Sequence, residues 1–287
     1  MSIVVTGATG QLGRLVTDSL LQRGVPARQI VATGRAVERL ADFAGRGVQV
    51  RAMDYDDPAT VADALKGATK VLLISGSAVG RRVEQHRAVI DAAVAEGVAL
   101  IAYTSIANAD TTGMKLAAEH QATENLLAAS GLPYVLLRNG WYLENYTEQL
   151  QGTLAQGAFA GSAGEGKVSA AARADYAEAA AAALLAEGQA GKVYELGGDE
   201  AFSMAELAGE ITAASRRPIA YQDLPASDYA AMLAGFGVPS DFADILADSD
   251  LGIARGDLHV TTKHLRTLIG RPTTPMAEAV SSAVSAL

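Results

Sequence analysis

A glycine pattern near the start of the chain restricts its fold more than any other feature. Gly7, Gly10 and Gly13 are spaced three residues apart in the stretch Thr6-Gly7-Ala8-Thr9-Gly10-Gln11-Leu12-Gly13. The pattern follows a short apolar segment, Ile3–Thr6, that is typical of a buried strand, and it opens an amphipathic segment, Gln11–Arg23, that is typical of a helix. A strand, a tight turn and a helix are the first elements of a βαβ unit.

Each glycine has its own role in a loop that binds a pyrophosphate. Gly7 permits the sharp turn, Gly10 lets the backbone approach the phosphates, and Gly13 lets the helix pack closely on the strand. The N–H groups and the positive dipole of the helix N-terminus attract the phosphates. The loop therefore predicts a dinucleotide site, to which we assign Gly7, Thr9, Gly10, Gln11, Leu12 and Gly13.

The first half of the chain continues to alternate short apolar segments with longer amphipathic ones. The expected strands are Ile3–Thr6, Ile30–Thr33, Val48–Ala52, Lys70–Ile74, Leu100–Tyr103 and Tyr134–Arg138. The expected helices are Gln11–Arg23, Val37–Gly45, Pro58–Leu65, Arg82–Glu96 and Met114–Ser130. Strands rich in Val, Ile and Leu with little alternation are covered on both faces, so the pattern predicts an α/β fold with a doubly wound parallel sheet of the Rossmann type.

The regular alternation ends after residue 138. We expect the end of a helix and a loop over Gly152–Gly166, a helix over Ala174–Glu187 and a short strand over Lys192–Leu196. Four prolines divide residues 203–287 into short helical segments. These features predict an NAD(P)-binding domain over residues 1–150. They also predict a smaller α/β region over residues 151–287 that packs on the same core and covers the cofactor cleft.

The end of the second strand distinguishes between the two nicotinamide cofactors. Domains selective for NAD place an acid about 20 residues after the glycine loop, where it binds the ribose 2′-hydroxyl. Here Thr33 and Gly34 are followed by Arg35, and no acid is present. A guanidinium at this position can pair with a 2′-phosphate, whereas the alternative is that Arg35 only solvates the start of a helix. The sequence favours NADP(H).

Composition excludes several other classes of function. The net charge of −9 argues against nucleic acid as a partner. No cysteine is present, and none of the four histidines forms a pair four residues apart, so no metal site is expected. The chain opens without a leader pattern and carries no apolar stretch that could span a membrane, which predicts a cytoplasmic location. The oligomeric state stays open.

Several stretches beyond the glycine loop together resemble one family. They are Leu73-Ile74-Ser75-Gly76-Ser77, Tyr103-Thr104-Ser105, Leu136–Tyr146 and Thr262–Thr274. Over essentially its whole length the chain is similar to the NmrA-like atypical short-chain dehydrogenases, most closely to bacterial NAD(P)H:quinone oxidoreductases and also to triphenylmethane dye reductases. The resemblance implies further cofactor contacts at Ser75, Gly76, Ser77, Asn139, Gly140, Trp141, Tyr142 and Arg173. Asp54 could reach the adenine amino group or could cap the helix that follows it.

The usual catalytic residues of short-chain dehydrogenases are incomplete here. Those enzymes use a serine together with a tyrosine and a lysine four residues apart on a helix. Ser105 stands in the place of the serine, but Leu116 and His120 stand where the tyrosine and the lysine would be. Without a phenol, reduction of a ketone to an alkoxide is disfavoured, whereas a quinone becomes a phenolate-like anion with a pKa of about 10 that water can protonate.

The resemblance therefore implies an NADPH-dependent oxidoreductase that transfers hydride directly to a quinone-like acceptor, without flavin. His120 and Tyr142 are the candidate catalytic residues: His120 would face the nicotinamide ribose, and Tyr142 would stack on a flat acceptor. The alternative for His120 is a partly exposed histidine paired with Glu124, which lies four residues later on the same helix. Two other functions stay open, a triphenylmethane dye reductase and a redox sensor that binds NAD(P) without turnover.

Overall fold

The computed structural model describes residues 2–287 and contains two compact units. The first unit contains the described residues up to Ile106 together with Glu119–Asn139 and Arg173–Tyr194. The second unit contains Ala107–Ala118, Gly140–Ala172 and Glu195–Leu287. The division of the chain at residue 150 stays a prediction.

A seven-stranded sheet with the strand order β3-β2-β1-β4-β5-β6-β9 forms the centre of the first unit. The strands are β1 (Ile3–Val5), β2 (Ile30–Gly34), β3 (Gln49–Ala52), β4 (Lys70–Leu73), β5 (Leu100–Ile106), β6 (Tyr134–Asn139) and β9 (Val193–Leu196). The pairs from β3 through β6 are all parallel. The order reverses between β1 and β4, as in a Rossmann sheet, and the predicted fold class is confirmed.

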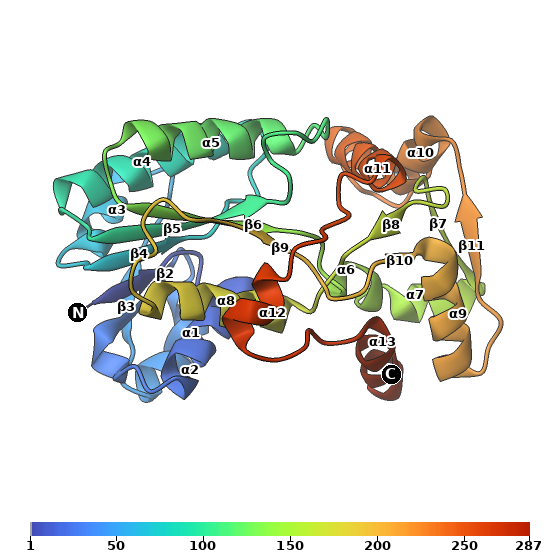
Figure 1. Ribbon diagram of the computed structural model, residues 1–287, viewed down its shortest axis with the longest axis horizontal. Coiled ribbons are helices and arrows are strands. Elements are labelled where there is room, and N and C mark those ends of the chain that lie inside the picture. Colours follow the sequence, from blue (N-terminus) through green and yellow to red (C-terminus); the bar gives the residue numbers. More distant parts are fainter. Residues whose placement is uncertain (1) are drawn as a thin grey trace. The chain divides into compact units, whose positions relative to one another are not determined.

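Helices cover both faces of this sheet (Figure 1). On one face lie α3 (Pro58–Leu65), α4 (Arg82–Ala95) and α5 (Ala117–Ala129), and on the other lie α1 (Gln11–Gln22) and α8 (Arg173–Leu185). Buried Val, Leu and Ile side chains of the strands fill the space beneath the helices, among them Val4, Val71 and Ile101, which are fully buried. This two-sided burial explains why the strands read as apolar runs rather than as alternating patterns.

Two helix predictions differ from the structure. The segment expected as one helix over Val37–Gly45 begins as a 3₁₀ helix, η2 (Val37–Leu40), and becomes α-helical only in α2 (Ala41–Gly45). The helix expected to start at Met114 starts at Ala117, so Leu116 lies in a turn before α5. Helix ends are set by the capping contacts of the folded chain, which local periodicity does not specify.

The second unit combines short strands with seven helices among the described residues. Its helices are α6 (Glu144–Thr147), α7 (Leu150–Gln156), α9 (Met204–Ser215), α10 (Ala226–Gly235), α11 (Ser240–Arg255), α12 (His264–Ile269) and α13 (Met276–Ser285). Its strands form two small pairs, an antiparallel pair of β8 (Lys167–Val168) with β10 (Phe202–Ser203) and a parallel pair of β7 (Ala158–Gly161) with β11 (Ala220–Asp223).

One prediction for this unit is wrong in part. The helix end expected within residues 152–166 is confirmed, since α7 ends at Gln156, but the expected loop contains the strand β7. The hydrogen-bonding partner of β7 is β11, about sixty residues later, and the paired residues include Phe159 with Tyr221. A strand that is defined by so distant a partner has no strong local signal, because its four residues contain two alanines and a glycine. Within residues 2–287, no helix is long and apolar enough to cross a membrane.

Candidate functional site

The candidate cofactor site of the first unit lies at the point where the strand order reverses. The loops that follow β1 and β4 leave the sheet at neighbouring carboxyl ends, since these two strands pair directly. Ligands of doubly wound sheets bind at such a switch point. The glycine loop follows β1, and the Ser75-Gly76-Ser77 stretch follows β4.

The glycine loop has the shape that a dinucleotide requires. Gly7 adopts a left-handed conformation with φ of +60°, which places the chain in the sharp turn. A Cβ atom on Gly13 would lie 2.5 Å from the Gly7 carbonyl oxygen and 2.7 Å from the Ala8 Cα, so only glycine fits at this helix–strand contact. Gly10 is the N-cap of α1, which has no side-chain cap and no acid in its first turn. The N-terminal amides of α1 thus suit a pyrophosphate.

The end of β2 carries the residue expected to distinguish between the cofactors. Gly34 packs against Thr9 so closely that a Cβ atom there would lie 2.6 Å from the threonine side chain. The next residue, Arg35, is exposed, as the pairing of its guanidinium with a 2′-phosphate requires. The cap of α3 is Asp57, whose carboxylate accepts from the amide of Ala59, whereas Asp54 accepts from the amide of Asp56. The alternative that Asp54 caps this helix is therefore wrong.

The loop after β4 is held by side chains from three other elements. The backbone N–H of Ile74 donates to Thr6 Oγ1 at 2.9 Å, and that of Ser75 donates to Thr104 Oγ1 at 2.9 Å. The N–H of Gly76 donates to His86 Nε2 at 3.0 Å. Ser75 is half-buried and Ser77 is exposed, so the hydroxyl of Ser77 is accessible to a ligand.

His120 lies in a different environment from either of those expected. Its side chain is 5% exposed, and its Nδ1 atom lies 2.7 Å from the hydroxyl of Tyr103, which is fully buried. Burial and the nearby Arg82 guanidinium lower the pKa of His120 to about 3, so its imidazole is neutral at pH 7. The interpretation of His120 as a partly exposed partner of Glu124 is wrong. A proposed contact with the nicotinamide ribose has to account for a histidine that is buried and already bonded to a phenol.

Glu124 is instead the centre of a second buried polar cluster. Its carboxylate accepts from Arg138 Nε at 2.9 Å and from Arg138 Nη2 at 2.7 Å. The hydroxyl of Ser105 donates to the same carboxylate at 2.6 Å. All three residues are buried, with exposed fractions of 8% or less. The serine that stands in the place of the catalytic serine is therefore engaged within the core by a carboxylate.

The remaining residues that were predicted to contact the cofactor are divided between the two units. Asn139 is buried at the end of β6 and Arg173 is half-buried at the first residue of α8, both in the first unit. The second unit contains Gly140, Trp141 and Tyr142, and Tyr142 forms an isolated bridge with Ala171. Both aromatic side chains are half-buried, so part of each ring remains available for contact with a ligand.

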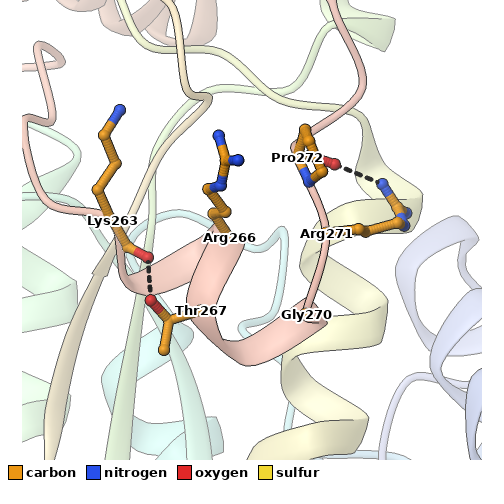
Figure 2. Close-up of a pocket in the computed structure, with 6 residues that line it drawn as sticks. All are labelled: Lys263, Arg266, Thr267, Gly270, Arg271 and Pro272. Atoms are coloured by element: carbon orange, nitrogen blue, oxygen red, sulfur yellow. Dashed lines mark hydrogen bonds between the residues drawn. The ribbon is translucent and has the colours of Figure 1, made fainter.

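A hollow of about 480 Å³ in the second unit contains none of the predicted site residues. Figure 2 shows its lining residues, which are Lys263, Arg266, Thr267, Gly270, Arg271 and Pro272. Lys263 and Arg266 form ion pairs with Asp199 at 3.8 Å and 3.3 Å. No aromatic ring lines this hollow, so it does not suit a flat acceptor.

Sequence reasoning assigned no role to four residues that the structure places around the candidate site. These are Thr6, Arg82, His86 and Tyr103. The available signal was weak: Thr6 and Thr104 are polar residues at the carboxyl ends of apolar strands, where site residues of parallel sheets gather. His86 gave no local signal, because its polar partners lie 10 and 37 residues away along the chain.

Comparisons with known proteins agree with this geometry. A family described as NAD(P)H-binding matches residues 7–187. Quinone oxidoreductase 2 of Escherichia coli (strain K12) is 51% identical over 279 residues, which cover 97% of this chain and 97% of that protein. The crystal structure of an NADPH-dependent quinone oxidoreductase from E. coli in complex with NADPH has a TM-score of 0.94 at 51% identity and covers 98% of this chain and 99% of that chain.

A third relative widens the range of known substrates. The Citrobacter sp. triphenylmethane reductase, in a structure with NADP(H), has a TM-score of 0.93 at 38% identity, and the match covers 98% of this chain and all of that chain, 100%. The match to the family covers more than half of the described chain and includes the complete glycine loop. This chain therefore belongs to the NAD(P)H-binding, NmrA-like family of atypical short-chain dehydrogenases.

Proposed function

We propose that this protein is an NADPH-dependent oxidoreductase that transfers a hydride directly to a quinone, without flavin. The observation that carries the proposal is a glycine loop shaped for a dinucleotide, in a chain that is 51% identical to an E. coli quinone oxidoreductase over 97% of its length. That relative supports the assignment of a quinone as the acceptor. The relative and the glycine loop both support the assignment of the cofactor. The enzyme supplies proximity and orientation to the two reactants.

Different residues bind the phosphates, the nicotinamide and the acceptor. The amides at the start of α1 and the side chain of Arg35 bind the phosphates, while Ser75, Ser77 and Asn139 bind the nicotinamide half of the cofactor. Tyr142 and Trp141 stack on the flat acceptor. When bound, the cofactor supplies the hydride. The product anion of a quinone has a pKa of about 10, so water protonates it and the protein needs no acid in contact with it.

The buried state of His120 and Tyr103 supports this assignment of roles. Burial raises the pKa of the Tyr103 hydroxyl, and the imidazole of His120 is neutral. Two neutral groups that share a hydrogen bond inside the core do not deliver a proton to a solvent-exposed product. We therefore propose that His120 acts by supporting the site from within the core, and that its replacement by alanine lowers the turnover rate by about 10–100-fold without abolishing it, because the reactants are less well oriented.

Reduction of benzoquinone by the purified protein tests the function. We expect NADPH to be oxidised in the presence of benzoquinone and not in the presence of simple ketones such as cyclohexanone, because only the quinone yields a weakly basic anion. Deuteration of the transferred hydrogen of NADPH is expected to slow the reaction if hydride transfer limits turnover. Rapid ketone reduction would contradict the absence of a protein acid. NADPH binding without reduction of any quinone or dye would indicate a redox sensor instead.

Replacement of Arg35 by alanine tests the choice of cofactor. We expect the KM for NADPH to rise by at least about tenfold, because a charge-assisted contact with the 2′-phosphate is lost, while the KM for NADH changes little. Arg23→Ala is the matched control, since Arg23 is an exposed arginine that directly follows the C-terminal end of α1. An equal effect of Arg35→Ala on both cofactors would remove Arg35 from the 2′-phosphate site.

Triphenylmethane dyes are a second candidate class of acceptor. The Citrobacter reductase of 38% identity supports this candidate. A cationic dye accepts a hydride and becomes neutral, so it requires no proton at all. Dye reduction uses the same cofactor site, and the ratio of kcat/KM for benzoquinone to that for malachite green decides which acceptor fits better.

A further inference from the structure

The loop after β4 is fixed by an unusual set of contacts in the first unit. Three consecutive backbone N–H groups, those of Ile74, Ser75 and Gly76, all donate to side chains from other elements. None of these amides is therefore left to bind a ligand. In this part of the loop the hydroxyls of Ser75 and Ser77 are the side-chain groups that can bind a cofactor.

The contact between Gly76 and His86 has a defined direction. Because His86 Nε2 accepts from the Gly76 amide at 3.0 Å, the proton of the neutral ring lies on Nδ1. Nδ1 then donates to Thr123 Oγ1 at 2.9 Å, and Thr123 Oγ1 donates to the carbonyl of Glu119 at 2.9 Å. The chain of hydrogen bonds runs one way from the loop into α5. His86 is fully buried, and burial and Arg82 lower its pKa to about 3, which keeps Nε2 as an acceptor.

The carbonyl group of Gly76 is held by the charged side chain of Arg82. Arg82 Nε donates to the Gly76 carbonyl oxygen at 2.7 Å. Arg82 is 5% exposed, and its Nη1 atom lies 3.6 Å from the carboxylate of Glu119. The second oxygen of Glu119 accepts from the amide of Gly80 at 2.9 Å, so this carboxylate also holds the end of the loop. Both polar groups of Gly76 are thus bonded to α4, and residue 119 of α5 supports the contact.

We propose that His86 and Arg82 are positioning residues for NADPH. By bonding the N–H and the C=O of Gly76, they fix the direction in which Ser75 and Ser77 present their hydroxyls to the cofactor. A Cβ atom on Gly76 would lie 3.1 Å from Gln85 Oε1, so a larger residue at this position would crowd that side chain. The proposal rests on the proposed binding of NADPH by this loop and deepens it, because it explains how a loop whose first three amides are already bonded can hold its hydroxyls toward a ligand.

Two substitutions of His86 separate the contact to the loop from the contact to α5. Glutamine places an acceptor oxygen near the position of Nε2, so His86→Gln keeps the bond to Gly76. Asparagine places a donor near the position of Nδ1, so His86→Asn keeps the bond to Thr123 and leaves the Gly76 amide without an acceptor. Gly76 is half-buried, so the loss of its acceptor is expected to change an equilibrium constant by roughly tenfold, near the lower end of the range for a fully buried amide.

The readout is the dissociation constant of NADPH, measured by the fluorescence of the bound cofactor. We expect His86→Asn to raise this constant by about tenfold or more and His86→Gln to leave it within about threefold of the wild type. At saturating NADPH, the kcat with benzoquinone is expected to be similar in both variants, so that the change appears in KM. Arg82→Lys is the second test, since it keeps the charge beside Glu119 but lacks Nε, and we expect the same rise in the constant.

Two controls distinguish positioning from loss of stability. Leu127→Ala removes a fully buried side chain of α5 that belongs to the hydrophobic core, and it is expected to lower the urea midpoint without changing the affinity for NADPH. Arg87→Lys alters an exposed arginine of α4 and is expected to change neither quantity. Equal dissociation constants for His86→Gln and His86→Asn, or an unchanged constant in Arg82→Lys, would overturn the proposal. A wild type that binds NADPH but reduces no quinone would contradict the proposed enzyme and leave this test intact.

Discussion

Replacement of Arg138 by methionine is expected to lower the free energy of unfolding of the first unit by about 3–5 kcal/mol. Arg138 comes from β6 and Glu124 from α5, and the two side chains form two hydrogen bonds at 2.9 Å and 2.7 Å. Both residues are buried, with exposed fractions of 7% and 8%. Removing the guanidinium leaves the carboxylate in the core without its cationic partner, although the Ser105 hydroxyl still donates to it, and an uncompensated buried charge is costly.

Urea unfolding of wild type, Arg138→Met and a double variant measures this effect. The double variant Arg138→Met, Glu124→Leu removes both charges, so we expect it to recover most of the lost stability. Lys66→Met is the control, because Lys66 and Asp63 form an exposed pair whose loss is expected to leave the free energy of unfolding nearly unchanged. A double variant as unstable as Arg138→Met would show that packing, and not charge, is the main contribution of the cluster.

Acidification is expected to destabilise the first unit because it contains two buried, neutral histidines. The pKa of His86 and the pKa of His120 are both lowered from 6.5 to about 3. Burial is the larger cause in both, and Arg82 adds to it. The unfolded chain therefore binds more protons than the folded chain between these two values. Their contribution to stability is fully present above pH 6.5 and is lost as the pH falls toward 3.

The expected loss between pH 7 and pH 5 is about 2 kcal/mol for each histidine, or about 4 kcal/mol for the pair. Asp250 of the second unit acts in the opposite sense, because burial raises its pKa to about 6 and the folded chain retains its proton at acidic pH. Urea unfolding at pH 7 and pH 5 gives the difference. His86→Gln and His120→Gln are each expected to halve the loss due to the histidine pair, whereas His259→Gln alters an exposed histidine and serves as the control. The same pH dependence in all four proteins would refute this explanation.

The sequence by itself determined the features that depend on local patterns. The spacing of Gly7, Gly10 and Gly13 predicted the loop that a dinucleotide requires. The steric reasons lie within the same turn: Gly7 has a positive φ, and a Cβ atom on Gly13 would clash with the backbone. The apolar segments predicted the parallel sheet, and the helix over Pro58–Leu65 was predicted with the bounds that the structure gives it. Arg35 was expected at the exposed end of β2, where it lies. These features are encoded within a few consecutive residues.

Only the tertiary structure decided the partners of the buried polar groups. His120 and Glu124 are four residues apart on α5, and this spacing allowed them to pair, yet each side chain finds its partner on the sheet. The acceptor of the Gly76 amide is a histidine of α4, and β7 became a strand only beside β11. A buried donor pairs with whichever acceptor the packing of sheet and helices brings within hydrogen-bond distance, because leaving it unpaired costs more than any local preference supplies. The hydrogen-bond partner of a buried polar group therefore depends on elements that are distant in the sequence.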